Sequence, residues 1–263
     1  MSERLDRYLV SHGLAKSRER AKDLIKNGLV SVNGRTADKA SVEITDSDTV
    51  LAGEDHKYVG RGAFKLLKAI EMFRISLEGL VCADIGASTG GFTQVMLEYG
   101  AAKVYAIDVG HDQLDPSLRA DPRVIDREGT NVRDITVKDF DEPIAFMSVD
   151  LSFISLKNVM GVLAGCLADG GSMAVLIKPQ FEAGKTAVGK NGVVRSPKEH
   201  IRILADLSLF FGECGLCVTG MTFSHIKGGS GNIEYLALLE KRPADTVADV
   251  REIVRQAFDE LGE

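Results

Sequence analysis

Four charged residues in this chain have the types and settings that can move a proton to or from an oxygen atom. They are two lysines and two acids, each in or beside an apolar segment: Lys65, Asp150, Lys178 and Glu234. Three of the four stand at an end of an apolar, strand-like run. Because open α/β sheets place their ligands in the crevice at the carboxyl ends of the strands, we expect these side chains to meet at a ligand site.

A lysine in such a group has two possible roles toward a hydroxyl group. As a general base, Lys178 would have to be deprotonated near neutral pH, which burial and a nearby Lys65 would favour. Asp150 and Glu234 would favour the ammonium form, which would instead stabilise the negative charge that develops on the oxygen. The sequence leaves both roles open.

The elements that must position these residues alternate between strand and helix patterns after residue 80. Strands are predicted at 80–85, 104–107, 124–125, 144–149, 173–177, 216–223 and 234–240, and helices at 63–73, 92–99, 156–167 and 197–211. This alternation predicts a doubly wound, Rossmann-like α/β sheet. The last two strands are too close in sequence for a helical crossover, so we expect the last strand to be antiparallel.

A glycine-rich turn, Asp84-Ile85-Gly86-Ala87-Ser88-Thr89-Gly90-Gly91, follows the first strand of this sheet. Its glycines let the backbone approach a ligand, and the helix after it offers free N–H groups to a carboxylate. Asp108 ends the next strand, 24 residues beyond Asp84, near the spacing of a ribose-binding acid in Rossmann-type domains. Ser88 replaces the middle glycine of the dehydrogenase pattern. Together with Asp150, these features favour S-adenosylmethionine over NAD.

The first fifty residues predict two short helices, at 5–10 and 17–27, and a small sheet with a hairpin turn at Asn33-Gly34. Arg18, Lys22 and Lys26 recur every four residues and therefore share one face of the second helix. The stretch from residue 1 to 35 has a net charge of +4, although the whole chain carries −6. A local basic face can bind phosphate, whereas the usual interpretation of a charge run is a solvated surface.

The 263 residues are enough for a small domain and a medium one. We predict domains at 1–57 and 63–263, joined near Lys57 by a basic, glycine-containing linker at 58–62. The chain shows no apolar stretch of signal-peptide or membrane-span length, so we expect a cytoplasmic protein. Four cysteines predict free thiols, and the lone Cys214-Gly215-Leu216-Cys217 is interpreted as a helix end entering a buried strand, so no metal site is expected.

Other reaction signatures are missing from the segments that would carry them. Asp150-Leu151-Ser152-Phe153 stands where adenine N-methylation commonly uses a Pro-Pro-aromatic motif, and no cysteine for cytosine C5 methylation lies between Cys82 and Cys166. Gly184-Lys185-Thr186 lacks the first glycine of a P-loop, because that position holds Pro179. We interpret the stretch 182–195 as a loop that closes over RNA.

The first fifty residues closely resemble the RNA-binding domain first described in ribosomal protein S-four. The resemblance involves both identity and spacing and is carried by Arg4-Leu5-Asp6, Ser17-Arg18, Ala21, Ile25, Gly28, Val30 and Val32-Asn33-Gly34. It implies an α+β domain that binds RNA. The residues we expect to contact RNA are Arg4, Arg18, Lys22, Lys26 and, in the linker, Arg61.

The whole chain resembles the TlyA or hemolysin-A group of rRNA 2′-O-methyltransferases, in which an S-four-like domain precedes an FtsJ-like catalytic domain. The resemblance implies S-adenosylmethionine as cofactor and a ribose 2′-hydroxyl, of cytidine in 16S or 23S rRNA, as substrate. It maps a catalytic Lys-Asp-Lys-Glu tetrad onto Lys65, Asp150, Lys178 and Glu234. It also implies cofactor contacts by Asp84, Gly86, Ser88, Gly90, Gly91, Asp108, Glu128 and Asn131. Ser88-Thr89 departs from the more usual Pro-Gly of the FtsJ pattern, which affects individual loop contacts.

Two alternatives belong to other functional classes. A membrane-active hemolysin, the activity after which some relatives are named, is opposed by the lack of a signal, a span or an amphipathic insertion helix. An RNA-binding module with an inactive methylase fold is opposed by the intact tetrad. We therefore expect ribosomal RNA or ribosomal subunits, and no stable membrane association, as partners of the protein.

Overall fold

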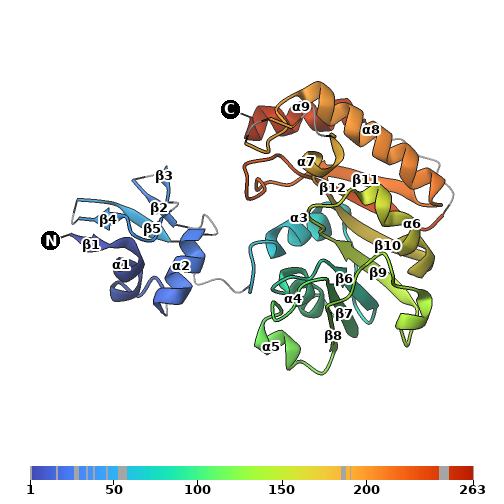
Figure 1. Cartoon of the computed structure of the whole chain (residues 1–263), viewed down its shortest axis with the longest axis horizontal. Coiled ribbons are helices and arrows are strands. Elements are labelled where there is room, and N and C mark those ends of the chain that lie inside the picture. The colour runs from blue at the N-terminus through green and yellow to red at the C-terminus, as the bar shows by residue number, and fades with distance from the viewer. Residues whose placement is uncertain are drawn as a thin grey trace. The chain divides into compact units, whose positions relative to one another are not determined.

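The computed structural model describes all residues except 1, 16, 27–29, 34, 38, 46, 53–57, 185–187, 190, 243–248 and 263. The chain divides into two compact units, Met1–Arg61 and Gly62–Glu263 (Figure 1). The predicted linker at 58–62 spans this division, while Lys57, where we expected the boundary, lies outside the described residues.

The first unit contains two helices and short strands, as the sequence predicts. Its elements are β1 (Glu3–Arg4), α1 (Leu5–Ser11), α2 (Arg18–Lys26), β2 (Val30–Val32), β3 (Arg35–Thr36), β4 (Glu43–Ile44) and β5 (Val50–Ala52). β2 lies between β3 and β5, and β1 pairs with β4. The apolar stripe of the two helices packs on the strands in a small core that includes Leu5, Leu9, Leu24, Val30 and Ile44. Gly34 of the predicted hairpin turn is outside the described residues.

The second unit is built on a seven-stranded sheet with the order β11-β12-β10-β9-β6-β7-β8. The strands are β6 (Val81–Ile85), β7 (Lys103–Asp108), β8 (Val124–Glu128), β9 (Ile144–Val149), β10 (Leu167–Ile177), β11 (Cys217–Phe223) and β12 (Tyr235–Glu240). β12 runs antiparallel to both of its neighbours, whereas the pairs among β10, β9, β6, β7 and β8 are parallel. The predicted Rossmann-like sheet with an antiparallel last strand is therefore confirmed.

The helices of this unit are α3 (Ala63–Phe73), α4 (Gly91–Glu98), α5 (Pro116–Arg119), α6 (Met160–Cys166), α7 (Pro179–Glu182), α8 (Pro197–Glu213) and α9 (Val250–Leu261), with 3₁₀ turns η1 (Val137–Asp139) and η2 (Leu156–Asn158). The single helix predicted at 156–167 is wrong, because Val159, at φ −130°, interrupts it between η2 and α6. β10 starts at Leu167, earlier than predicted, because Leu167 pairs with Ile144 of β9 ahead of a register irregularity that ends at Ser172. Helix α9 was not predicted from the sequence.

Helices cover both faces of the sheet, as Figure 1 shows. α6, α8 and α9 contribute to one apolar core together with alternate strand residues such as Ala83, Ile85 and Met147. α4 packs on the other face, because its Thr93 bonds to Asp84, which lies between those two inward positions on β6. In the described part of the chain, no helix has the length and apolar character that a bilayer crossing requires.

Candidate active site

Three of the four predicted catalytic residues lie next to strand ends at one edge of the sheet, and the fourth lies in helix α3. Asp150 directly follows β9 and Lys178 directly follows β10, and these two strands are parallel neighbours. Glu234 directly precedes β12, which runs antiparallel to β10 with Ile177 opposite Tyr235. The antiparallel strand therefore begins where β10 ends and brings Glu234 beside Lys178. Lys65 lies in the first turn of α3.

The tetrad forms two ion pairs. Lys65 Nζ donates to Glu234 Oε2 at 2.6 Å, and this pair is buried, with the two residues 7% and 2% exposed. Lys178 Nζ lies 2.5 Å from Asp150 Oδ1 and donates to Ser152 Oγ at 2.9 Å. Each lysine of the tetrad is thus paired with one carboxylate.

Lys65, Lys178 and Glu234 line one cavity of about 420 Å³. The cavity is also lined by the hydroxyl-bearing Ser152 and by the aromatic residues Phe153 and Phe181. Three small residues line it as well: Gly192, Gly229 and Ser230. A cavity that presents two ammonium groups beside carboxylates can bind a hydroxyl group and stabilise negative charge on its oxygen. The structure thus brings the tetrad together around a space that a substrate hydroxyl can enter.

Asn232 holds one wall of this tetrad cavity and was not predicted as a site residue from the sequence. It is fully buried, accepts the Val194 N–H at 3.0 Å and donates to the Gly192 carbonyl at 2.9 Å. These bonds tie the segment before α8 to the residues just ahead of Glu234. A buried, doubly bonded amide fixes backbone geometry, so Asn232 sets the position of the wall relative to the tetrad.

Phe153 is a second site residue that was not predicted from the sequence. Its side chain is 91% exposed, and its φ of +64° is a left-handed backbone conformation that large residues rarely adopt. The Phe153 ring lies 5.3 Å from the Phe181 ring. A strained, exposed aromatic residue that lines a cavity is consistent with a role in binding rather than in stability.

The glycine-rich turn after β6 lies directly against the tetrad. Gly86 has φ +85°, and a Cβ at this position would lie 2.4 Å from the carbonyl oxygen of Asp150. Asp150 in turn donates its backbone N–H to the Ile85 carbonyl at 2.9 Å. Only glycine fits this contact without moving the backbone, so the turn and the tetrad acid are positioned together.

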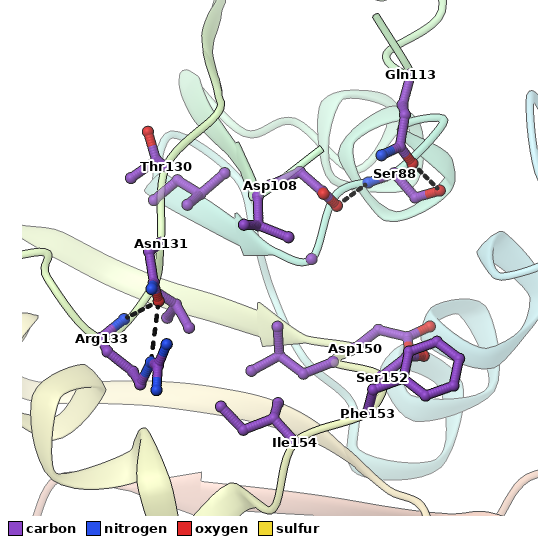
Figure 2. A pocket seen from close by; sticks show the side chains of 15 residues that line it. Ser88, Asp108, Gln113, Thr130, Asn131, Arg133, Asp150, Ser152, Phe153 and Ile154 are labelled. Atoms are coloured by element: carbon purple, nitrogen blue, oxygen red, sulfur yellow. Dashed lines mark hydrogen bonds between the residues drawn. The ribbon is translucent and has the colours of Figure 1, made fainter. Parts of the chain in front are cut away.

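A second cavity, of about 530 Å³, opens between this turn and the ends of β7, β8 and β9. Figure 2 shows Asp108 and Ser88 on one side of it and Asp150, Ser152 and Phe153 on another. Thr130, Asn131 and Arg133 line the far end, and Asn131 Oδ1 accepts the backbone N–H of Arg133 at 3.1 Å. Asp150 of the tetrad lines this cavity, and Ser152 and Phe153 line both cavities, so a ligand here would lie next to the tetrad charges.

Not every predicted cofactor residue lines this second cavity. Gly86, Ser88, Asp108 and Asn131 do, whereas Asp84, Gly90, Gly91 and Glu128 do not. Asp84 is fully buried beneath the turn and accepts bonds from the Thr93 N–H and hydroxyl and from the Ser148 hydroxyl. Burial raises the pKa of Asp84 to about 6, while these bonds act in the opposite direction. Asp84 therefore anchors the turn to α4 and β9.

Gly90 and Gly91 form the start of α4. Gly90 has φ +93°, and a Cβ on it would lie 2.3 Å from Leu118 Cδ1, so this glycine makes room for α5 to pack against the turn. Gly91 is the first residue of the helix and is buried. Gly90 lies against Leu118 and Gly91 is buried, and neither glycine lines the cavity.

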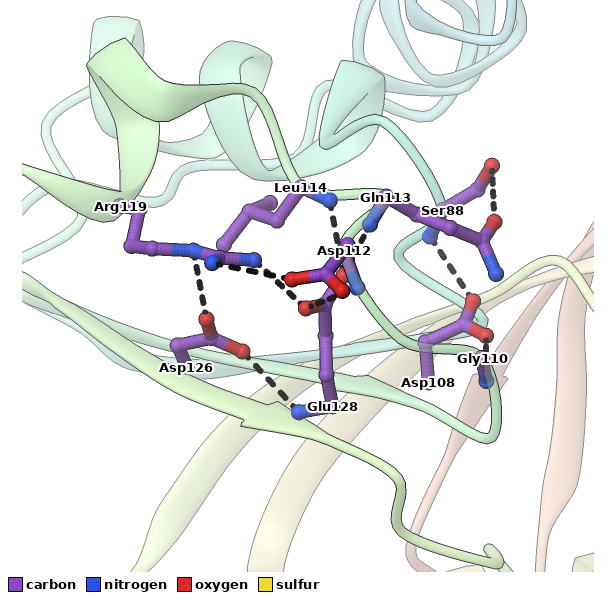
Figure 3. Close-up of polar contacts among 9 residues, drawn as sticks. All are labelled: Ser88, Asp108, Gly110, Asp112, Gln113, Leu114, Arg119, Asp126 and Glu128. Atoms are coloured by element: carbon purple, nitrogen blue, oxygen red, sulfur yellow. Dashed lines mark hydrogen bonds and ion pairs between the residues drawn. The ribbon is translucent and has the colours of Figure 1, made fainter.

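The acid at the end of β7 is held by two backbone N–H groups. Asp108 Oδ2 accepts the N–H of Ser88 at 2.9 Å, and Oδ1 accepts that of Gly110 at 2.8 Å (Figure 3). Each carboxylate oxygen retains a further lone pair for a ligand hydroxyl. Glu128, its register partner on β8, is instead occupied by protein groups: the N–H groups of Asp112, Gln113 and Leu114 and the side chain of Arg119.

In the first unit, two of the predicted RNA-binding arginines converge on one buried acid. Asp6 accepts from Arg4 at 3.0 Å and from Arg18 at 2.8 Å, and hydrogen bonding from Arg4 is the main cause that lowers the pKa of Asp6 to about 2. Both guanidinium groups remain partly exposed. Lys22 is exposed on α2, and Lys26 ends this helix with its side chain outside the described part of the structure.

Among the described residues, Arg61, Cys214 and Cys217 line neither of these two cavities. Arg61 is the last residue of the first unit. Cys214 follows α8 and Cys217 opens β11, which is the predicted helix end entering a buried strand. Lys185 and Thr186 are outside the described residues. Among the residues that the structure describes, no three His, Cys, Asp or Glu side chains are grouped to hold a metal ion.

Comparison with known proteins identifies both parts of the chain. Residues 58–241 match the FtsJ-like methyltransferase family, and residues 3–50 match the S4 domain. The chain is 43% identical over 238 residues to the 16S/23S rRNA (cytidine-2′-O)-methyltransferase TlyA of Mycobacterium tuberculosis, covering 90% of this chain and 89% of the relative. It is 43% identical over 235 residues to Hemolysin A of Brachyspira hyodysenteriae, covering 89% of this chain and 98% of the relative. A solved structure from Streptococcus thermophilus has 45% identity and a TM-score of 0.80, over 98% of this chain and 96% of that one.

Proposed function

Because this chain belongs to the FtsJ-like methyltransferase family and carries an S4 domain ahead of its catalytic domain, we propose that it methylates ribose 2′-hydroxyls of ribosomal RNA. The observation that carries the proposal is the meeting of two cavities at Ser152 and Phe153, one lined by the glycine-rich turn, Asp108 and Asp150 and the other by Lys65, Lys178 and Glu234. In line with the relative from Mycobacterium tuberculosis, the proposed target is cytidine in 16S or 23S rRNA. Such a substrate implies action in the cytoplasm.

The residues around the second cavity fit S-adenosyl-L-methionine. Gly86 and Ser88 provide a backbone that a ligand can approach, Asp108 has lone pairs left for ribose hydroxyls, and Asn131 offers amide groups to a base edge. The apolar part of the wall suits the faces of an adenine ring and consists of Ile107, Val109, Val132, Leu151 and Ile154. When bound, this cofactor supplies a methyl group activated on a sulfonium.

Lys178 is the residue that we propose to meet the ribose oxygen. Lys178 forms an ion pair with Asp150, and its positive charge would stabilise the negative charge that develops on the ribose oxygen. The hydroxyl proton passes to the Asp150 carboxylate or to water. Lys65 and Glu234 add a second, buried ion pair to the same cavity, which would help to orient the ribose hydroxyl, and such alignment can itself supply several kcal/mol.

Phe153 provides the surface on which the target base can stack. A base in RNA reaches a buried active site only when it leaves its helical stack, and exposed aromatic rings stabilise the released base. Phe153 lines both the cofactor cavity and the tetrad cavity, so a base stacked on it has its ribose beside Lys178. Its exposure and its pairing with Phe181 support this assignment.

The S4 domain is the proposed RNA-docking unit, with Arg4, Arg18, Lys22, Lys26 and the linker residue Arg61 as phosphate contacts. Replacing Arg18, Lys22 and Lys26 together by glutamine is expected to weaken RNA binding broadly across sequences, because interactions with phosphates carry no base information. The slope of log affinity against log salt should fall by about one for each phosphate interaction that the substitutions remove.

Filter-binding titrations at several salt concentrations measure this slope. Replacing Arg251 and Arg255, two exposed residues of α9 in the catalytic unit, provides the matched control and should leave the slope unchanged. An unchanged slope in the α2 variant would show that its basic face is only solvated.

The function itself is tested by incubating the full-length protein with S-adenosylmethionine and purified ribosomal subunits or deproteinised rRNA. Mass spectrometry of nuclease fragments then maps each added methyl group to a nucleotide and to its ribose or base. We expect ribose methylation of cytidine. Methylation confined to bases would contradict the reaction, and cofactor and RNA binding without any methyl transfer would support an inactive RNA-binding module instead.

A further inference from the structure

The carboxylate of Glu128 holds three consecutive peptide groups of the segment between β7 and α5. Its Oε1 accepts the N–H groups of Gln113 and Leu114 at 2.7 and 2.8 Å, and its Oε2 accepts that of Asp112 at 2.9 Å. These bonds, that of Leu114 most strongly, lower the pKa of Glu128, so the group is a carboxylate at neutral pH. A single ionised side chain thus fixes the path of this segment.

A second layer of contacts holds Glu128 itself, as Figure 3 shows. Arg119 donates to Glu128 Oε2 at 2.6 Å and forms an ion pair with Asp126 at 2.9 Å. Asp126 also accepts the backbone N–H of Glu128 at 3.0 Å. The carboxylate therefore has all of its acceptor positions directed at the protein, which leaves it unsuited to bind an adenine edge.

The segment held by Glu128 is attached at three points to the glycine-rich turn. The Gln113 side chain accepts from Ser88 Oγ at 3.3 Å, and the Asp115 N–H donates to the Thr89 carbonyl at 3.2 Å. Leu114 and Leu118 occupy the space beside Gly90, where a Cβ would lie 2.8 and 2.3 Å from them. Glu128 thus acts on the cofactor cavity through this segment and not by facing it.

Of the three residues whose N–H groups Glu128 accepts, Gln113 is the one that lines the cofactor cavity. A Cβ built on Gly110 would lie 1.6 Å from Gln113 Nε2 and 3.2 Å from Asp108 Oδ1, so the amide and the carboxylate approach the same point. The carboxylate can only accept hydrogen bonds, whereas the amide nitrogen can donate them. A hydroxyl group both donates and accepts, and the pair therefore complements a ribose hydroxyl in both roles.

We infer that Gln113 and Asp108 together hydrogen-bond a ribose hydroxyl of the cofactor. Glu128 is the positioning residue that holds Gln113 at this place. The inference rests on the proposed function, since it assumes an adenosyl cofactor in the cavity of about 530 Å³. It also gives Glu128 a role that differs from the cofactor contact implied by the family resemblance.

The first test measures the affinity of the full-length protein for S-adenosylhomocysteine and for its 2′-deoxy and 3′-deoxy analogues by calorimetry. Gln113→Ala should weaken S-adenosylhomocysteine binding by about 3- to 10-fold, the effect of one neutral hydrogen bond. With the analogue that lacks the recognised hydroxyl, the same substitution should have an effect below about two-fold. Gln113 is exposed, so its truncation is not expected to alter the fold.

The second test replaces Glu128 by glutamine, which keeps the shape but lowers the number of hydrogen bonds that the side chain can accept. We expect S-adenosylhomocysteine affinity to fall by about ten-fold or more, while the single-turnover rate at saturating cofactor stays near wild type. In this background, adding Gln113→Ala should cause little further decrease, because the two residues act through one interaction. Glu142→Gln, an exposed acid paired with Lys103, is the matched control and should leave the affinity unchanged.

Two failures are distinguishable. If the wild-type protein does not bind S-adenosylhomocysteine, the proposed function itself is contradicted. If it binds, but Gln113→Ala lowers the affinity for both deoxy analogues as much as for the parent compound, Gln113 forms no hydrogen bond with a ribose hydroxyl and the inference is overturned. Additive decreases in affinity for Glu128→Gln and Gln113→Ala would likewise overturn the positioning role of Glu128.

Discussion

Replacing Lys178 by alanine is expected to slow methyl transfer by about 10²- to 10³-fold, the effect of removing one preorganised electrostatic group from an active site. Affinity for S-adenosylhomocysteine should change little, because Lys178 lines the tetrad cavity and not the cofactor cavity. Single-turnover rates with saturating enzyme measure the chemical step, and calorimetry measures cofactor binding. Lys138→Ala, an exposed lysine in η1, is the matched control.

Lys178→Arg separates the two roles of this lysine. A guanidinium group cannot act as a base near neutral pH but still carries positive charge. If Lys178 stabilises charge, as its ion pair with Asp150 supports, the arginine variant should retain measurable single-turnover activity. A complete loss of activity in the arginine variant would favour proton abstraction by Lys178, and a near wild-type rate in the alanine variant would contradict the assignment of the tetrad.

Replacing Gly86 by valine is expected to weaken cofactor binding by on the order of a hundred-fold or more. A φ of +85° costs a residue with a side chain about 1 to 2 kcal/mol, and overpacking against the Asp150 backbone adds a further 1 to 3 kcal/mol. The turn must shift to relieve the contact, which changes the cofactor cavity and moves Asp150 at the same time. Calorimetry with S-adenosylhomocysteine measures the decrease in affinity.

Gly161→Ala in α6 is the matched control, since Gly161 has no atom within 4 Å of an added Cβ and lies in a helix. This control should bind the cofactor normally. RNA binding by the Gly86→Val protein should keep its salt dependence, because the S4 domain has its own core. Unchanged cofactor affinity in the valine variant would place the cofactor elsewhere.

Local patterns were sufficient to identify the strands and the helices α3, α4 and α8 of the catalytic unit. The apolar run ahead of Asp150 forms β9, and the run ahead of Lys178 forms the second half of β10, because continuous apolar residues are buried on both faces of a parallel sheet. The interruption at Val159 and the early start of β10 were not predictable in this way. Glu182 of α7 accepts bonds from Ser155 and Leu156 at the start of η2. Leu167 of β10 pairs with Ile144 of β9, so in both places contacts with distant residues accompany the departure from the local pattern.

The roles of individual acids were likewise not predictable from local sequence patterns. Asp84, Asp108 and Glu128 all stand in or at the ends of strands, and the sequence implied that all three contact the cofactor. Only Asp108 lines the cavity. Asp84 lies on the buried side of its strand, and Glu128 faces the backbone N–H groups of the next segment, so the direction of each side chain and its available partners decide its role.

The sequence by itself determined which residues carry charge beside apolar strands, where glycine permits a turn, and that a basic S4-like domain precedes a methyltransferase sheet. Only the tertiary structure decided the pairings within the tetrad. Lys65 and Glu234 are separated by 169 residues and meet because β12 enters the sheet antiparallel to β10. Residue type and periodicity depend on near neighbours in the chain, whereas contacts between distant residues depend on strand order and register, which no local segment contains.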